Sequence, residues 1–149
     1  MHVQPIEKAK LFVGVMYSKG TEIKKILSEL IKKYGKISIE SEEIPFNFTD
    51  YYAPEMGESI VKKFFVFEKP IDRSKIGLVK IFTNKIEDEH SIDGKRKFNL
   101  DPGYVNKTQL VLASAKETGH KIYLGKGMFA HLTYIYANKQ WMPTERCFP

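Results

Sequence analysis

The chain has 149 residues, of which 42% are hydrophobic and 28% charged, values typical of a folded globular protein. They exclude a disordered chain, and no apolar run approaches the roughly 20 residues that span a bilayer. The net charge of +6 is compatible with a nucleic-acid or nucleotide ligand but does not require one. We expect a single domain over 1–149, without a membrane partner. We place it in the cytoplasm, because the first residues lack the apolar core of a signal peptide.

Cys147 is the only cysteine, and the histidines are scattered along the chain. An internal disulfide and a cysteine metal cluster are therefore excluded, and we interpret Cys147 as a thiol without a catalytic role. The histidines lack the short pairwise spacing of a zinc site. We therefore predict no metal site from them, and the sequence identifies no cofactor.

The first part of the chain predicts a strand, a helix and a second strand. Residues 10–17 form a near-continuous apolar run, which predicts a central strand buried on both faces. In 21–34 the apolar residues recur with the spacing of one helical face, and Gly35 stands where a helix C-terminal cap would. Alternating apolar and polar residues in 36–42 predict a half-exposed strand.

The middle of the chain predicts another strand and another helix. Residues 44–56 hold two prolines and many aromatics without a regular period, so we interpret them as an ordered connection. Residues 59–68 predict a strand that Pro70 ends, and a second helix is expected over about 72–90.

The last third predicts antiparallel strands joined by glycine turns. Residues 98–100 predict a short strand that ends at 101–103, because Asp-Pro-Gly is a strong turn sequence. Beyond it, apolar segments separated by glycine turns predict a three-stranded meander, with strands at 110–115, 120–124 and 128–136.

This order of elements predicts an α+β fold. We expect a two-layer sandwich, in which a mostly antiparallel sheet of about six or seven strands carries two helices on one face. The first half has the order of a ferredoxin-like split β-α-β unit. Folds of this kind carry many functions, so the fold alone assigns none.

Three short patterns are similar to GTPase motifs but depart from them. Residues 14–21 (GVMYSKGT) lie between the expected strand and helix, but the lysine and glycine of a phosphate loop are transposed. Residues 84–87 (NKIE) and 114–116 (SAK) are similar to guanine-binding motifs, yet the first falls inside an expected helix. The acidic switch motif is also missing, so we do not predict a GTPase.

His131 and Thr133 form a His-x-Thr pattern on an expected strand, as in two-histidine phosphoesterases. That chemistry needs two such motifs, with one histidine as base and the other as acid. Because the sequence holds no second copy, we interpret both residues as ordinary strand residues.

Two segments combine acids, hydroxyls and aromatics. Residues 48–57 (FTDYYAPEMG) and 99–104 (NLDPGY) each place carboxylates beside tyrosines, and ordered loops often carry binding residues. A purely structural interpretation is equally open, since Asp50 and Asp101 can bond within their own turns.

A third segment is the expected hairpin at 114–124. Lys116 and His120 lie near its turn, where they can receive an anion. The same residues are also ordinary members of a hairpin.

These segments carry a resemblance to a known family. The runs FTDYYAPEMG, LDPGYV and LVLASAKETGHKIYL, within a match from about 10 to 141, resemble the bacterial and archaeal domain-of-unknown-function family 4416. The resemblance implies a family without an assigned function, some of whose members bear a GTP-binding label, and it carries over no catalytic residue. The matching positions are Thr49, Asp50, Tyr51, Tyr52, Glu55, Met56, Gly57, Asp101, Pro102, Gly103, Tyr104, Lys116, His120 and Tyr123.

Our leading hypothesis is a site for a small anionic or nucleotide-type ligand where the three segments converge. Lys116 and His120 would hold the anion, and the carboxylates would act as acid–base groups or hold a divalent ion. The candidate catalytic residues are Asp50, Glu55, Asp101 and His120. The candidate ligand-binding residues are Tyr51, Tyr52, Tyr104, Lys116 and Tyr123.

Two alternatives come from other functional classes. One is a single-stranded RNA-binding module, in which Tyr134 and Tyr136 on one face of a strand stack on bases. The other is a structural or partner-binding protein without a ligand of its own. The sequence does not decide whether the chain is an enzyme.

Overall fold

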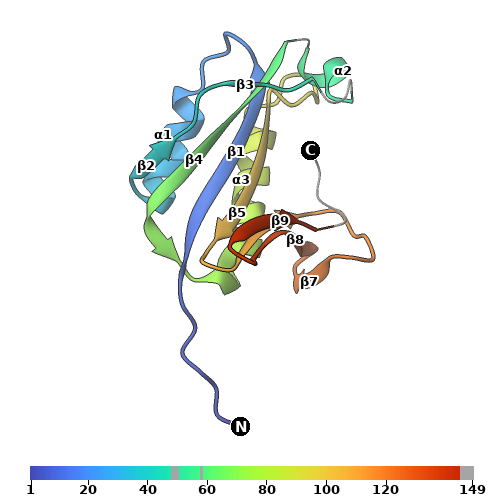
Figure 1. Cartoon of the computed structure of the whole chain (residues 1–149). Helices are drawn as coiled ribbons and strands as arrows, with labels where there is room; N and C mark the ends of the chain where they lie inside the picture. The colour runs from blue at the N-terminus through green and yellow to red at the C-terminus, as the bar shows by residue number, and fades with distance from the viewer. Residues whose placement is uncertain (48–50, 58, 145–149) are drawn as a thin grey trace.

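The computed structural model of the chain describes residues 1–47, 51–57 and 59–144 (Figure 1). In these residues, one sheet of nine strands pairs antiparallel throughout. The predicted α+β class is confirmed, although the sheet has more strands than expected. The elements are β1 (Ala9–Ser18), α1 (Lys24–Tyr34), β2 (Ile37–Glu40), β3 (Ile44–Pro45), α2 (Ala53–Met56), β4 (Ile60–Ile71), a 3₁₀ turn (Arg73–Lys75), α3 (Ile76–Glu89), β5 (Phe98–Val105), β6 (Gln109–Ser114), β7 (Ile122–Gly125), β8 (Met128–Ala137) and β9 (Gln140–Pro143).

The strands lie in the order β2-β4-β1-β5-β6-β8-β7, with β3 beside β4 and β9 beside β8. β1 is the central strand that its apolar run predicts, because it pairs with β4 and β5 and residues 11–17 are all buried. β3 and α2 form within the segment interpreted as an ordered connection, and β3 and β9 add to the expected number of strands.

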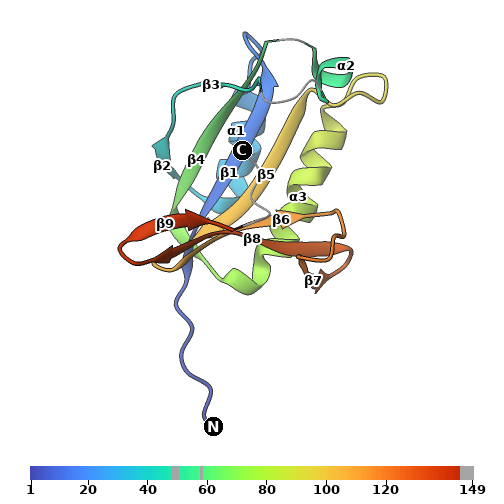
Figure 2. The same ribbon diagram turned by 45° about the vertical axis from the view of Figure 1, so that its right-hand side comes forward.

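Helices α1 and α3 cover the same face of the sheet. Ile26 of α1 and Val79 and Ile86 of α3 share one core cluster with Val13 and Val15 of β1. Figure 2 shows α1 behind β1 and β4, and α3 running along β5. Within the described residues, neither these helices nor α2 combine the length and apolarity needed to cross a membrane.

The sheet changes direction between β5 and β6. Strands β1, β4 and β5 run along the length of the molecule, whereas β6, β8 and β9 run across its lower end (Figure 2). Gly103 lies at this crossing, where a Cβ atom would stand 2.4 Å from the carbonyl oxygen of Val111 and 2.5 Å from the ring of Phe12. Only glycine allows the strands to approach so closely.

Two predicted strand ends are wrong. Residues 101–103 do not turn, because they lie inside β5, where Pro102 pairs with Val13. Leu100, two residues earlier, directs its N–H and C=O away from β1, so the missing N–H of Pro102 removes no bond to that strand. Pro70 also lies inside β4, next to a shift in register opposite β1, where proline is tolerated.

The last strands do not form the expected meander. β8 pairs with both β6 and β7, so it lies between them. The reason is burial: Phe129, His131 and Thr133 of β8 are buried, whereas residues 122–124 of β7 are exposed. The more apolar strand occupies the inner position, and the polar connection before β7 is long enough to reach around it.

We expect Gly103→Ala to destabilise the fold by at least about 2 kcal/mol, because the new methyl group overlaps a backbone oxygen that cannot move without breaking the β5–β6 pairing. Urea denaturation followed by circular dichroism measures the loss. Gly119→Ala is the matched control, since a Cβ there meets nothing within 4 Å. Equal losses for the two variants would contradict the close-approach argument.

Candidate functional site

The short helix α2 is packed against the face of the sheet opposite to α1 and α3. Met56 of α2 is buried against Met16 of β1 and Ile60 of β4, in a cluster separate from the main core. The ring of Tyr52 packs edge-on against Phe46 at 6.0 Å and against Tyr51 at 5.0 Å. This packing fixes Tyr51, Tyr52 and Glu55 on the open face of the sheet.

Asp101 is the centre of an ion cluster on that face. Its carboxylate accepts hydrogen bonds from Lys62 Nζ at 3.2 Å and from Asn99 Nδ2 at 2.9 Å, and Lys80 Nζ lies 3.9 Å away. Lys62 comes from β4, so its stem crosses β1 to reach Asp101. It passes over Gly14, where a Cβ atom would stand 2.9 Å from Lys62 Cε. The strand glycine therefore makes room for the lysine rather than for a phosphate.

Arg96 joins this cluster to α2. Its Nε donates to Glu55 Oε1 at 2.7 Å, and its Nη1 donates to Asn99 Oδ1 at 2.9 Å and lies 3.5 Å from Glu87 Oε2. The planar guanidinium suits such a fork of acceptors. Arg96 therefore holds the loop that carries Tyr51 and Tyr52 against the start of β5.

Tyr52 is electrostatically coupled to Asp101. Burial, and next the charge of Asp101, raises the pKa of the Tyr52 phenol above its ordinary value. The phenol therefore stays neutral and keeps its proton to donate. The 51–57 and 99–104 segments meet through Arg96, which bonds both Glu55 and Asn99, as the hypothesis of a shared site requires.

Two side chains of α3, Lys80 and Glu87, bond the backbone of β5 in the same region. Leu100 N donates to Glu87 Oε2 at 2.8 Å, and Lys80 Nζ donates to the Leu100 carbonyl at 2.9 Å. In the described residues β6 pairs with β5 only over Gly103–Val105, so these two side chains replace a neighbouring strand at Leu100. Burial raises the pKa of Glu87, while Lys80 and the bond from Leu100 oppose that shift.

The hairpin after β6 carries a second set of cations. Lys121 Nζ donates to Ser114 Oγ at 3.0 Å and to the Lys116 carbonyl at 3.2 Å. Lys116 Nζ lies 5.5 Å from the ring centre of Tyr51, so this hairpin also meets the 48–57 segment. Burial, and next the charge of Lys116, lowers the pKa of Lys121. Among the ion pairs of the described residues, none involves Lys116 or Lys121.

The other three described candidate residues have structural partners, and only His120 of them lies on the hairpin next to Lys121. Tyr104 is buried in the core on the helix side, where its hydroxyl donates to Gln109 Oε1 at 3.2 Å, so it does not face Asp101. The Tyr123 hydroxyl accepts from Gly127 N at 3.2 Å and braces the β7–β8 turn. The ring of His120 packs against that of His131 at 4.7 Å, which ties it to β8.

Asp50, the remaining candidate acid, lies outside the described residues. In the described part of the chain, no group of three or more histidine, cysteine, aspartate or glutamate side chains is arranged to hold a metal ion. Glu55 and Asp101 are instead bonded to cations and an amide.

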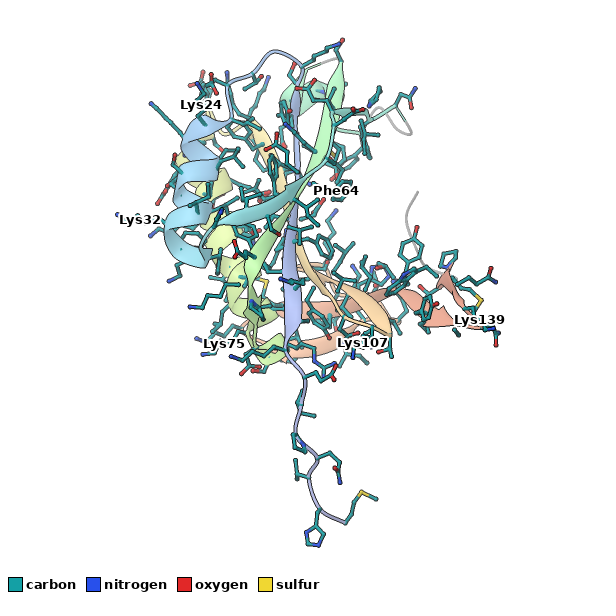
Figure 3. All side chains as sticks on the ribbon, turned by 60° about the vertical axis from the view of Figure 1, so that its left-hand side comes forward. Lys24, Lys32, Phe64, Lys75, Lys107 and Lys139 are labelled. Carbon is teal, nitrogen blue, oxygen red and sulfur yellow. The ribbon has the colours of Figure 1, made fainter. Side chains whose placement is uncertain are left out.

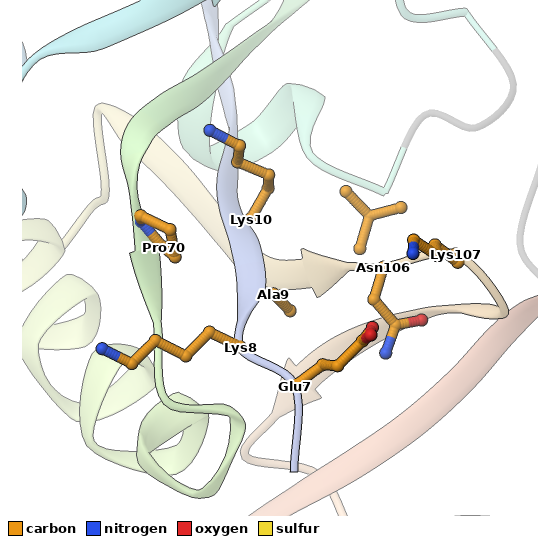
Figure 4. A pocket seen from close by; sticks show the side chains of 8 residues that line it. Glu7, Lys8, Ala9, Lys10, Pro70, Asn106 and Lys107 are labelled. Atoms are coloured by element: carbon orange, nitrogen blue, oxygen red, sulfur yellow. The ribbon is translucent and has the colours of Figure 1, made fainter. Parts of the chain in front are cut away.

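Two hollows of the surface lie away from this cluster. One, of about 380 Å³, is lined at the start of β1 by Lys8, Lys10, Pro70 and Lys107 among others (Figure 4). The other lies between α1 and β2. Neither hollow is lined by a residue of the Asp101 cluster or of the hairpin after β6.

Comparison with known proteins identifies the family. A family model described as Domain of unknown function (DUF4416) matches residues 7–149, nearly the whole chain. The chain belongs to this family. The resemblance carried by the FTDYY, LDPGY and LVLAS segments is therefore confirmed. No curated protein and no solved structure matches the chain, so the DUF4416 family alone supplies the context.

Sequence reasoning missed most of the cations and amides of the Asp101 cluster. Lys80 and Glu87 are separated by seven residues on α3, so they share a buried face with Thr83. Because these polar residues recur on the buried face of an otherwise apolar helix, the sequence pattern could have predicted that Lys80 and Glu87 make buried polar contacts. Lys62 and Arg96 have no such pattern, because Lys62 bonds a residue of another strand and Arg96 bonds residues of α2 and β5.

We expect Glu87→Leu to lower the free energy of unfolding by about 1–3 kcal/mol, because it leaves the buried Leu100 N–H without an acceptor. Glu87→Gln keeps a carbonyl acceptor and removes a buried charge, so its loss should be smaller. Denaturant unfolding gives both values, and amide exchange at Leu100 should quicken only in the leucine variant. Equal losses with unchanged exchange would contradict this role.

Proposed function

We propose that this chain binds a small anionic, nucleotide-type ligand on the open face between α2, β5 and the hairpin after β6. Lys116 and Lys121 would hold the anionic group. Tyr51 and Tyr52 would contact a planar portion, and Asp101 with Asn99 would bond hydroxyl or amino groups. The proposal concerns binding and names no reaction or cofactor.

The observation that supports it most is that, within the described residues, the two hairpin lysines have no carboxylate partner. Lys116 lies close enough to lower the pKa of Lys121, and none of the ion pairs in the described residues neutralises either. Lys121 Nζ also bonds the Lys116 carbonyl, so both cations belong to one turn, and an anion bound there would lower the repulsion between them. The fixed hydrogen bonds of Lys121 keep its charge in place for such an anion.

The Asp101 cluster suits the uncharged polar part of the ligand rather than its anionic group. Its three cations, Lys62, Lys80 and Arg96, face three carboxylates, Glu55, Glu87 and Asp101. This balanced set has no net attraction for an anion, but Asp101 keeps a partly exposed carboxylate that accepts hydrogen bonds. A ligand with a phosphate at one end and hydroxyls at the other suits both ends of this surface.

A single-stranded RNA-binding module is the second candidate. Tyr136 and Trp141 form a ring pair on the β8–β9 hairpin at 5.4 Å, and each is more than 40% exposed. Exposed rings of this kind stack on bases. An RNA site would bind with a steep salt dependence and would lose affinity in Tyr136→Ala.

We also infer that the first half belongs to the ferredoxin-like class. The order β2-β4-β1-β5, with α1 and α3 as connections, supports this assignment. A fold of this class does not by itself favour either ligand.

We expect pyrophosphate or a mononucleotide to raise the thermal midpoint of the native chain, because a ligand that binds only the folded state stabilises it. Lys116→Gln and Lys121→Gln should each weaken binding by about tenfold or more, through loss of a charge-assisted hydrogen bond. Isothermal titration calorimetry measures the change.

Lys25→Gln is the matched control, because this exposed lysine lies on α1, away from the hairpin. The affinity of the Lys25→Gln variant for pyrophosphate should equal that of the native chain. Equal weakening in all three variants would indicate a general effect of net charge and would contradict the site. Binding of short RNA, lost in Tyr136→Ala and unchanged in Lys116→Gln, would favour the second candidate.

The affinity for pyrophosphate should fall as the pH rises through the lowered pKa of Lys121. A bound anion favours the charged amine and raises that pKa, so binding takes up a proton and is strongest below the free-state pKa. Without ligand, the lowered pKa means that the unfolded chain binds this proton more tightly than the folded chain does. The free energy of unfolding therefore rises as the pH increases from the folded-state pKa of Lys121 toward the ordinary lysine value of 10.5. Calorimetry over a pH series checks this, and Lys121→Gln should flatten the profile.

A further inference from the structure

The strand β2 ends the sheet opposite to the candidate site. It pairs with β4 on one side, and in the described part of the chain no strand lies beyond it (Figure 1). An end strand presents backbone N–H and C=O groups to solvent, and a second strand can add to it.

An apolar hollow adjoins this edge. It measures about 440 Å³ and is lined by Leu27 and Ile31 of α1 and by residues 36–40. Ile39 is 62% exposed and Ile31 is 42% exposed. An open strand edge beside an apolar hollow offers backbone bonds together with a place for side chains, which is the arrangement used in strand addition.

We propose that β2 pairs antiparallel with β2 of a second copy of this chain. The sequence Lys36-Ile-Ser-Ile-Glu40 is complementary to itself about its middle residue, Ser38. With a two-fold axis at Ser38, Lys36 stands opposite Glu40 of the second copy, and Ile37 stands opposite Ile39 of the second copy. The same pairs recur on the other side of the axis, as a closed symmetric dimer requires.

The charges select a copy of this chain over other strands. Opposite charges directly across two antiparallel strands stabilise the pair, whereas like charges destabilise it. β2 is short and has a register shift between Ile37 and Ile39, and both features discourage indiscriminate edge pairing. A partner strand must therefore place an acid opposite Lys36 and a base opposite Glu40. A second copy of this segment does so on both sides of the two-fold axis.

The present contacts of the two charges leave them available. Lys36 Nζ lies 4.0 Å from Glu68, and both side chains are more than 60% exposed. Glu40 Oε1 lies 2.6 Å from Lys63 Nζ, but the Glu40 side chain remains 54% exposed. A carboxylate can accept from a second cation through its other oxygen.

Analytical ultracentrifugation over a wide range of concentration tests the pairing. The native chain should show a reversible monomer–dimer equilibrium. Lys36→Glu and Glu40→Lys should each weaken it by about tenfold, because each turns both symmetric pairs into like charges. The double variant Lys36→Glu/Glu40→Lys restores opposite charges and should recover the native dimer constant.

Lys107→Glu is the matched control, because it makes the same charge change at the β5–β6 turn, far from β2 (Figure 3). It should leave the dimer constant unchanged. The double variant breaks the pairs with Glu68 and Lys63 within one copy, so its recovery can come only from contact between copies. Thermal unfolding of each variant as a monomer confirms that it folds.

A native chain that stays monomeric at every concentration would overturn the proposal and would leave this edge to a strand of another protein. A double variant no tighter than the single ones would also overturn it. So would a dimer that the single charge reversals leave unchanged, because it would form through another surface.

Discussion

The N–H and C=O groups of Leu100 point away from β1 and need hydrogen-bond partners on the other side of β5. The arrangement of charged side chains on the open face depends on how these two groups are bonded. Within the described residues, strand β6 pairs with β5 only from Gly103 to Val105, so it does not bond the two backbone groups of Leu100. Glu87 and Lys80 of α3 bond them instead. A buried N–H or C=O without a partner is strongly unfavourable, so α3 must run along this edge. Its charged side chains then bring a buried carboxylate and a buried ammonium group beside Asp101.

These buried charges need partners of their own, and the partners position α2. Arg96 lies beside Glu87 and also binds Glu55 of α2. Lys62 reaches Asp101 from β4 across Gly14. A set of charges drawn from β4, β5, α2, α3 and the connection before β5 thus balances itself, because an unpaired buried charge would be very unfavourable. The same bonds hold Tyr52 and Tyr51 toward the hairpin, where Lys116 and Lys121 form no ion pair with another described residue.

The two ends of the sheet differ in the protection of their edges. At one end, β7 is short and exposes Ile122 and Tyr123. At the other end, β2 exposes Ile39 between two opposite charges. Charge at an edge strand discourages most partners, and a self-complementary arrangement of the charges favours one partner in particular.

The sequence by itself determined the elements whose pattern is local. The apolar run of β1 and the helical spacing in α1 predicted a central strand and an amphipathic helix, because burial on both faces or on one stripe leaves a period in the chain. The FTDYY, LDPGY and LVLAS segments likewise predicted the family. Local patterns failed at Pro102 and Pro70, since a proline can stay in a strand where its missing N–H would face away from the ladder or beside a bulge.

Only the tertiary structure decided which residues meet. Lys62, Glu87 and Arg96 are distant in sequence from Asp101 or lack a pattern that links them to it, and their pairing follows from strand order and from the missing β6 neighbour at Leu100. Tyr104 lies only three residues after Asp101, yet side chains alternate along a strand, so it points into the core on the other face. Sequence records which side chains can be buried or charged, but the partner of each depends on contacts between strands and helices that no local pattern encodes.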